Sequence, residues 1–159
     1  LSARLNDASS EYLSWKLNSL IHAVDSIKLL KEINKQAQHN DRVIDCLLQI
    51  HIAKEETKFG FTPDELHTML QEGEWKQFPN VRICGLMCMA TNTDDETQIA
   101  SEFEYAHQIF EEVKRTYLAD AESFRELSMG MSGDYLIAQQ HGSTMVRIGS
   151  MIFGERQYN

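Results

Sequence analysis

Short apolar runs alternate with helical patterns along most of the chain, and this alternation constrains the fold more than any other feature. Apolar runs predict five strands, at residues 19–25, 43–52, 82–89, 124–129 and 144–148. Apolar residues three or four apart predict helices between them, over 27–37, from 62 to about 73, over 94–117 and over 133–141. Such alternation is typical of a parallel sheet with helical crossovers. The sequence therefore predicts an α/β fold, either an open doubly wound sheet or part of an eight-stranded barrel.

Small polar residues mark where the predicted helices begin. Ser26 can cap the first helix, and Thr62 with Glu65 forms a capping box at the start of the second. Ser132 is the expected cap of the last, short helix, which we expect to stop at Gly142.

The charge balance limits the partners of this chain. Its 159 residues carry a net charge of -9 and contain no basic stripe. Because binding to a nucleic-acid backbone needs clustered Lys and Arg, we expect no nucleic acid as a main partner. No apolar run is long enough to cross a bilayer, and no leader-like segment is evident. We therefore expect a cytoplasmic protein without a membrane partner.

The three cysteines, Cys46, Cys84 and Cys88, are expected to be reduced core residues. Cys84 and Cys88 are four residues apart, and on a regular strand this spacing puts both side chains on one face. No nearby His or Cys completes a set of ligands with them, so we expect no metal site.

Two successive strand ends carry small residues that can donate hydrogen bonds. The segment 127–132 leaves a strand and enters a helix at Ser132, and helix N-termini attract anions. Gly149 and Ser150 follow the next strand, where a glycine permits close approach and a hydroxyl can donate. In a barrel, the loops after the last two strands often bind phosphate. The alternative is that these turns only close loops, as most such turns do.

Arg147 lies within the last predicted strand. Because Val146 and Ile148 should face the helices, Arg147 should point to the opposite side of the sheet, into a barrel. A buried guanidinium needs partners. The residue type alone favours an ion pair, for instance with Glu126 or Asp25, over a contact with a ligand.

Other polar residues are weaker candidates. His22, His51 and His141 have no ligand spacing, and we expect packed or exposed histidines rather than catalytic ones. Lys54 and Lys58 follow the second strand, where a solvated loop lysine is the default expectation.

Several blocks of the chain resemble the pyridoxal phosphate homeostasis proteins. Two of them, Leu-Ser-Met-Gly-Met-Ser-Gly-Asp-Tyr and Gly-Ser-Thr-Met-Val-Arg-Ile-Gly-Ser, are specific together because of their order and separation. The matching segments, which together run from about Ser19 to Tyr158, include 19–35, 49–53, 58–60, 83–90, 127–135, 142–150 and 152–154.

This resemblance implies an eight-stranded barrel related to the N-terminal domain of alanine racemase. Pyridoxal 5'-phosphate would lie at the carboxyl ends of the strands, with Ser132, Gly149 and Ser150 at its phosphate. Arg147 would face the pyridine nitrogen, which replaces the ion pair as our expectation. An arginine there donates to an unprotonated nitrogen and makes the ring a poorer electron sink.

The chain also differs from the family that it resembles, because segments of the family are not matched here. The family carries a Schiff-base lysine on its first strand, and no segment here matches that strand or the next strands that precede the five matched ones. We therefore expect a truncated, partial (β/α) TIM-type barrel with about the last five strands of eight. Residues 1–18 stay unassigned, and residues 19–159 form the C-terminal portion of the pyridoxal-phosphate-binding domain. Open edges of such a barrel would favour self-association.

Three functions follow from these observations. The first is a non-catalytic protein that binds pyridoxal phosphate and serves cofactor homeostasis without the covalent lysine. The second is a fold-type III pyridoxal phosphate enzyme resembling an amino acid racemase. The third is a truncated remnant with no function.

Overall fold

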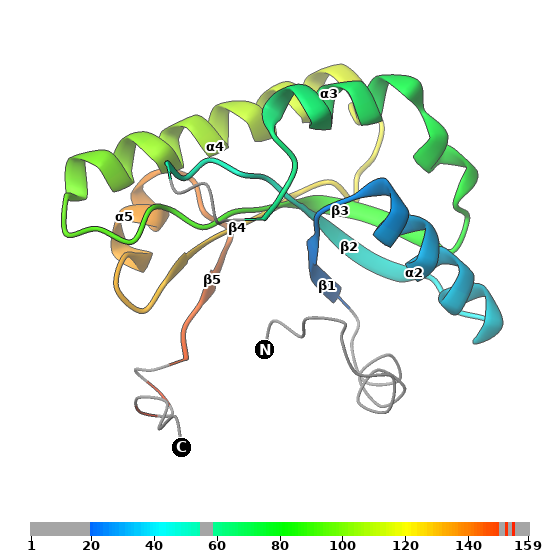
Figure 1. The fold of residues 1–159 in the computed structure, drawn as a ribbon, viewed down its shortest axis with the longest axis horizontal. Coiled ribbons are helices and arrows are strands. Elements are labelled where there is room, and N and C mark those ends of the chain that lie inside the picture. Colours follow the sequence, from blue (N-terminus) through cyan, green and yellow to red (C-terminus); the bar gives the residue numbers. More distant parts are fainter. Residues whose placement is uncertain (1–19, 55–58, 150–151, 153, 155–159) are drawn as a thin grey trace.

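Five parallel strands form a curved sheet in the order β1-β2-β3-β4-β5 (Figure 1). The computed structural model describes residues 20–54, 59–149, 152 and 154. Along the chain, the elements are β1 (Leu20–Val24), α2 (Ile27–His39), β2 (Ile44–Gln49), α3 (Pro63–Glu72), the 3-10 helix η1 (Glu74–Gln77), β3 (Val81–Met87), α4 (Glu96–Tyr117), β4 (Glu126–Met131), α5 (Tyr135–Gln140) and β5 (Met145–Arg147). The predicted partial barrel is confirmed: the sheet and its helices form a half-barrel.

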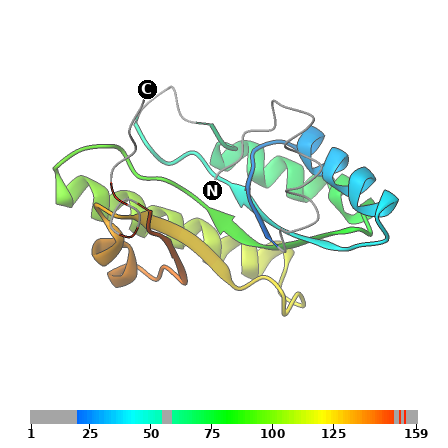
Figure 2. The same cartoon turned by 90° about the horizontal axis from the view of Figure 1, so that it is seen from below.

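The long helices lie along one face of this sheet. Figure 1 shows α3 and α4 packed over the strands, with α2 and α5 toward the two ends, and Figure 2 views the half-barrel from below. None of the helices in the described ranges is long and apolar enough to cross a membrane.

Local sequence signals set most helix boundaries. Ser26 caps α2 by accepting a hydrogen bond from Leu29 N at 3.3 Å. The capping box of α3 forms as predicted: Glu65 N donates to Thr62 Oγ1 at 3.3 Å, and Thr62 N donates to Glu65 Oε2 at 2.8 Å. Gly73 ends α3 with φ of 73°, a conformation that glycine adopts without the steric cost of a Cβ.

The predicted cap of α5 is wrong. Ser132 lies in a turn, and the helix begins only at Tyr135, with Asp134 as the preceding residue. The Asp134 carboxylate does not cap α5; its Oδ1 accepts from Met131 N at 2.6 Å and closes the turn. Residues 133 and 134, which the sequence assigned to the start of the helix, belong to this turn, so α5 has only six residues.

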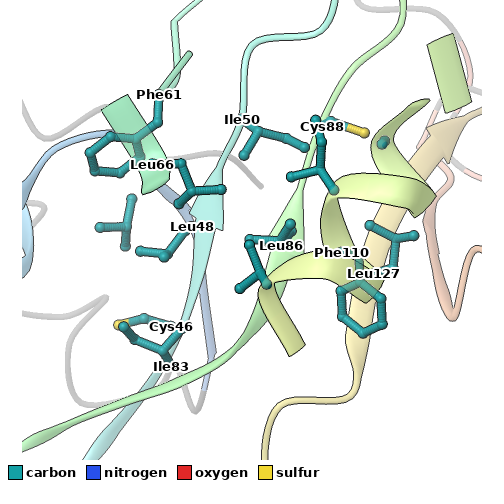
Figure 3. Close-up of a cluster of buried hydrophobic side chains, with 14 of the residues drawn as sticks. Cys46, Leu48, Ile50, Phe61, Leu66, Ile83, Leu86, Cys88, Phe110 and Leu127 are labelled. Carbon is teal, nitrogen blue, oxygen red and sulfur yellow. The ribbon is translucent and has the colours of Figure 1, made fainter. Parts of the chain in front are cut away.

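Most of the core lies between the strands and the helices. Figure 3 shows this helix-facing core, where Leu48, Leu86 and Leu127 on three strands meet Leu66 of α3 and Phe110 of α4. These side chains are almost completely removed from water, which provides the main stabilisation of the fold. A smaller cluster of Leu47, Cys84 and Met87 contains no residue from these helices and lies on the other side of the sheet, here called the inner face.

A bulge in β3 changes which side chains face the helices. Cys46 pairs with Ile83, whereas the next residue, Leu47, pairs with Gly85, so β3 contains one extra residue. Cys84 therefore lies on the inner face, and Cys88 lies in the helix-facing core. The prediction that both cysteines share a face is wrong, because it assumed unbroken alternation.

The three cysteines are free thiols and buried, as the sequence predicted. Burial raises the pKa of Cys88 to about 12, and burial also raises the pKa of Cys46 and Cys84. These thiols are therefore protonated and packed, as expected for core residues.

Gly85 is required where β3 approaches β4. A Cβ at this position would lie 1.7 Å from the carbonyl oxygen of Glu126, a backbone atom that cannot rotate away. We expect Gly85→Ala to lower the free energy of unfolding by at least about 3 kcal/mol, measured by urea denaturation. The control is Gly133→Ala, because no atom of the described residues beyond its chain neighbours lies within 4 Å of its added Cβ, and a change below about 0.5 kcal/mol is expected. Equal effects of the two substitutions would contradict the close approach of β3 to β4 at Gly85.

Candidate functional site

A polar cluster of His22, Ser128 and Arg147 occupies the inner face of the sheet. His22 lies on β1, Ser128 on β4 and Arg147 on β5. The Nδ1 atom of His22 lies 3.4 Å from Ser128 Oγ, although β2 and β3 separate the two strands in the sheet order. The curvature of the half-barrel therefore brings residues from distant strands together.

Arg147 points to the inner face, as strand alternation predicted. Its Nη1 donates to the backbone oxygen of Ser128 at 2.9 Å and to Ser128 Oγ at 2.8 Å. Its Nη2 donates to the backbone oxygen of Cys88 at 2.8 Å. The ion pair expected from residue type, with Glu126 or Asp25, does not form among the described residues: Glu126 instead accepts from Thr144 Oγ1 and contacts Arg125.

Backbone carbonyls take the place of a carboxylate partner for Arg147, because the hydrogen-bond ladder between β3 and β4 ends beside its guanidinium. Cys88 N donates to Ser128 O at 3.0 Å, just beyond the last residue of β3. A carbonyl past the end of a ladder needs a donor, and Arg147 supplies it to Cys88 O. The guanidinium thereby joins the ends of β3, β4 and β5 while it keeps its charge. Burial lowers the pKa of Arg147, but an arginine remains protonated at neutral pH.

His22 is held in its neutral form. Burial lowers the pKa of His22 below its ordinary value of 6.5, and the charge of Arg147 lowers it further. Ser128 is fully buried, and its hydroxyl lies between the imidazole and the guanidinium. The cluster is therefore positively charged on Arg147 alone and contains no described carboxylate.

The two turns that the sequence singled out emerge side by side. Met131 of β4 pairs with Arg147 of β5 in a parallel register, so the turns after both strands lie at the same edge. Ser132 is half-buried in the first turn, and Gly149 is exposed in the second. Among the described residues, no atom beyond the chain neighbours lies within 4 Å of a Cβ added to Gly133 or Gly149, so both turns border open space in the described part of the chain. Ser150, the fourth predicted ligand residue, lies outside the described residues.

A buried carboxylate supports the neighbouring loops. Glu102 of α4 is 7% exposed and accepts from Thr91 N and Thr91 Oγ1, both at 2.7 Å. Gln98 Nε2 also donates to Glu102. Thr91 Oγ1 in turn accepts from Lys54 N at 3.1 Å. The loops after β2 and β3 are thus fixed to each other and to α4 at the carboxyl edge of the sheet.

The other predicted candidates lie elsewhere. His141 follows α5, and its Nδ1 is 3.1 Å from Glu104 Oε2 on α4, outside the polar cluster. The backbone N–H of Lys54 donates to Thr91 Oγ1, but Lys54 itself is exposed. Lys58 lies outside the described residues. Within the described ranges, no three His, Cys, Asp or Glu side chains are placed to hold a metal ion.

Sequence reasoning missed Ser128 and undervalued His22. Both interrupt otherwise apolar strands at inward positions, flanked by residues such as Leu127 and Met129 that face the helices. A single polar residue at an inward strand position was the available signal, but it did not reveal that the two residues meet across the barrel.

The fold and the cluster define a class of protein. Parallel strands with outer helices, and polar side chains gathered at the carboxyl edge, are the arrangement of (β/α)-barrel binding sites. A family model described as "Alanine racemase, N-terminal domain" matches residues 4–157. The chain therefore belongs to the alanine racemase N-terminal domain family, in the group of the pyridoxal phosphate homeostasis proteins. The match begins upstream of Ser19, where we had expected the resemblance to start.

Two curated relatives, one bacterial and one human, are both described as pyridoxal phosphate homeostasis proteins. The pyridoxal phosphate homeostasis protein of Aquifex aeolicus is 35% identical over 155 residues, which cover 98% of this chain and 65% of that protein. The human protein of the same description is 35% identical over 143 residues, covering 88% of this chain and 51% of that protein. The chain therefore spans roughly half to two thirds of the length of these relatives.

Solved structures agree with the fold. PipY of Synechococcus elongatus, a COG0325 family member solved without pyridoxal phosphate, has a TM-score of 0.82 and 27% identity, covering 94% of this chain and 67% of PipY. PipY with pyridoxal phosphate bound has a TM-score of 0.79 and 25% identity, covering 96% and 68%. Alanine racemase of Clostridium difficile, at 16% identity and a TM-score of 0.66, covers 98% of this chain and 39% of the racemase, and shows the shared fold alone.

The neutral state of His22 predicts a pH dependence of stability. Because the folded state lowers the pKa of His22 below 6.5, unfolding takes up a proton as the pH falls through this value. The stability present above pH 6.5 should be lost progressively until the pH falls below the lowered pKa. His22→Asn should reduce this loss, measured by urea denaturation from neutral to mildly acidic pH. His39→Asn, on the exposed end of α2, should not reduce it. The same acid loss in His22→Asn as in the wild type would contradict the assignment.

Proposed function

We propose that this chain binds pyridoxal phosphate at the carboxyl edge of the half-barrel and serves cofactor homeostasis rather than catalysis. The position of Arg147 carries this proposal, because its guanidinium is fixed on the inner face beside two turns that border open space. The descriptions of the curated relatives and the bound state of PipY support the choice of ligand.

Arg147 suits the pyridine nitrogen of the cofactor. Its contacts with Ser128 and Cys88 use three guanidinium N–H groups of the five. The other two, on Nε and Nη2, have no acceptor in the described part of the chain. A pyridine nitrogen can accept from such a donor only when it is unprotonated. The ring of pyridoxal phosphate withdraws electrons most strongly when this nitrogen is protonated, so Arg147 favours holding the cofactor over carbanion chemistry.

The phosphate would lie at the turns around Ser132 and Gly149, with Ser150 as a further donor. The backbone N–H groups of exposed turns and the Ser132 hydroxyl are suitable donors to a phosphate. α5 has six residues and an Asp134 carboxylate before it, so the turns rather than the helix dipole would provide the phosphate contacts.

We further propose that no lysine of this chain captures the cofactor covalently. In the described ranges, the lysines lie on α2, η1 and α4 and in the loop after β2, whereas the polar cluster lies on the inner face of the strands. Lys54 is exposed in that loop, and a covalent lysine needs a desolvated amine beside the ligand.

The test is a titration of the purified chain with pyridoxal phosphate, followed by borohydride reduction and intact mass measurement. We expect saturable binding, no reduced covalent adduct, and an affinity about 10- to 100-fold weaker in Arg147→Gln, because a hydrogen bond from a charged group is lost. Arg82→Gln is the matched control, since Arg82 is largely exposed and pairs with Asp45 near the amino ends of β2 and β3, whereas the turns follow the carboxyl ends of β4 and β5.

Each contrary result has a distinct meaning. A covalent adduct would show that a lysine of this chain captures the cofactor, with Lys54 and Lys58 as the first residues to substitute. Amino acid racemisation by the purified protein would favour the racemase-like alternative. An absence of ligand-dependent stabilisation would favour the remnant.

The open sheet leads to a proposal about assembly. In the described part of the chain, β1 and β5 each pair with one neighbouring strand, so each has a free edge. Free edges and an apolar inner face with Leu47 and Met87 favour association with another copy. We expect the sedimentation coefficient of the isolated chain to rise with protein concentration. A monomer that unfolds sharply and independently of concentration would contradict this.

A further inference from the structure

We propose that Ser128 and His22 are positioning residues for Arg147: His22 Nδ1 accepts the Ser128 hydroxyl proton, so that Ser128 Oγ accepts from Arg147 Nη1 and fixes the plane of the guanidinium. The proposal rests on the proposed function where it concerns ligand affinity, because the ligand acceptor is then the pyridine nitrogen of pyridoxal phosphate. The hydrogen-bond arrangement itself does not depend on the ligand.

The direction of each hydrogen bond follows from the donors present. Arg147 has only donors, so Ser128 Oγ must accept in the 2.8 Å contact with Nη1. The single hydroxyl proton is then available for another acceptor, and His22 Nδ1 at 3.4 Å is the neighbouring one. A donation in this direction requires a neutral His22 with its proton on Nε2, whereas an Nδ1–H that donated to Ser128 Oγ would leave the hydroxyl proton without this acceptor. Ser128 acts as donor and acceptor at once and links β1 to β5 through β4.

The surrounding charges favour this arrangement. The charged group that faces His22 among the described residues is Arg147 on β5, while Ser128 on β4 is uncharged. Cys88 lies on the helix side of β3 with its thiol protonated, and it contributes only a backbone oxygen. A protonated His22 would place two cations around one hydroxyl; the carboxylate of Asp134 acts on Arg147 through its charge, and no described carboxylate acts on His22.

The arrangement restricts a side chain that otherwise has many rotamers. Arg147 could reach Ser128 O and Cys88 O with its plane tilted, but the contact of Nη1 with Ser128 Oγ selects one orientation. A guanidinium fixed before binding loses little conformational entropy when it meets a ligand acceptor. Ser128 and His22 would therefore increase affinity without touching the ligand.

The test combines imidazole NMR with ligand titration. In the wild type, the nitrogen shifts of His22 should show the Nε2-protonated tautomer, and the Arg147 side-chain N–H signals should be protected from exchange. Ser128→Ala should remove that protection, return His22 to a mixture of tautomers, and weaken pyridoxal phosphate affinity about 10-fold or more. His22→Leu should also weaken the affinity, whereas His22→Asn should largely rescue it, because the amide oxygen can take the place of Nδ1.

Ser143→Ala is the matched control. Ser143 Oγ lies between the same two strands, 2.8 Å from Met129 O and 3.0 Å from Met145 O, and can donate its single proton to either, but it has no contact with Arg147. We expect it to lower stability without changing the His22 tautomer or the ligand affinity. If His22→Leu does not fold, Ser128→Ala and His22→Asn decide the question, since both preserve the shape of the site.

The two proposals fail differently. A wild type that does not bind pyridoxal phosphate contradicts the proposed function, while the NMR signals still decide the positioning role. An unchanged His22 tautomer and unchanged Arg147 protection in Ser128→Ala would overturn the positioning role, even if pyridoxal phosphate binds.

Discussion

The candidate site depends on the hydrogen bonds of one half-buried guanidinium, that of Arg147. Arg147 has no carboxylate partner among the described residues and instead donates to Cys88 O, Ser128 O and Ser128 Oγ. Two of these acceptors are backbone atoms, which the strands hold in fixed positions. The guanidinium is thus hydrogen-bonded by the scaffold, and among the described residues no carboxylate forms an ion pair with it, although the charge of Asp134 raises its pKa. Such a cation is available to a ligand that accepts hydrogen bonds.

The position of these acceptors depends in turn on the approach of β3 to β4. Gly85 lets the two backbones meet, and the extra residue in β3 reverses the alternation of the strand. The side chain of Cys88 consequently packs under the helices. The bulge lies toward the start of β3 and the site lies beyond its end, so a local irregularity in packing decides which groups the site presents.

Sequence patterns predicted the elements better than their details. The caps at Ser26 and Thr62 were confirmed because each depends on residues within three positions of one another. The cap at Ser132 was wrong because the Asp134 carboxylate closes a turn before α5 begins. The inward direction of Arg147 followed from strand alternation, but its hydrogen-bond partners did not. The expected ion pair considered only side-chain acceptors, whereas Arg147 also donates to backbone carbonyls at the ends of β3 and β4.

The sequence by itself determined the order of strands and helices, the apolar face of each helix, and the two strand ends that carry Ser132, Arg147 and Gly149. These features depend on the periodicity of apolar residues and on hydrogen bonds between residues close in the chain, and both can be read directly from the sequence. Only the tertiary structure decided that His22 and Ser128 meet. Their positions are 106 residues apart in the chain, and their contact depends on the curvature of the sheet, which is set by packing and bulges across several strands.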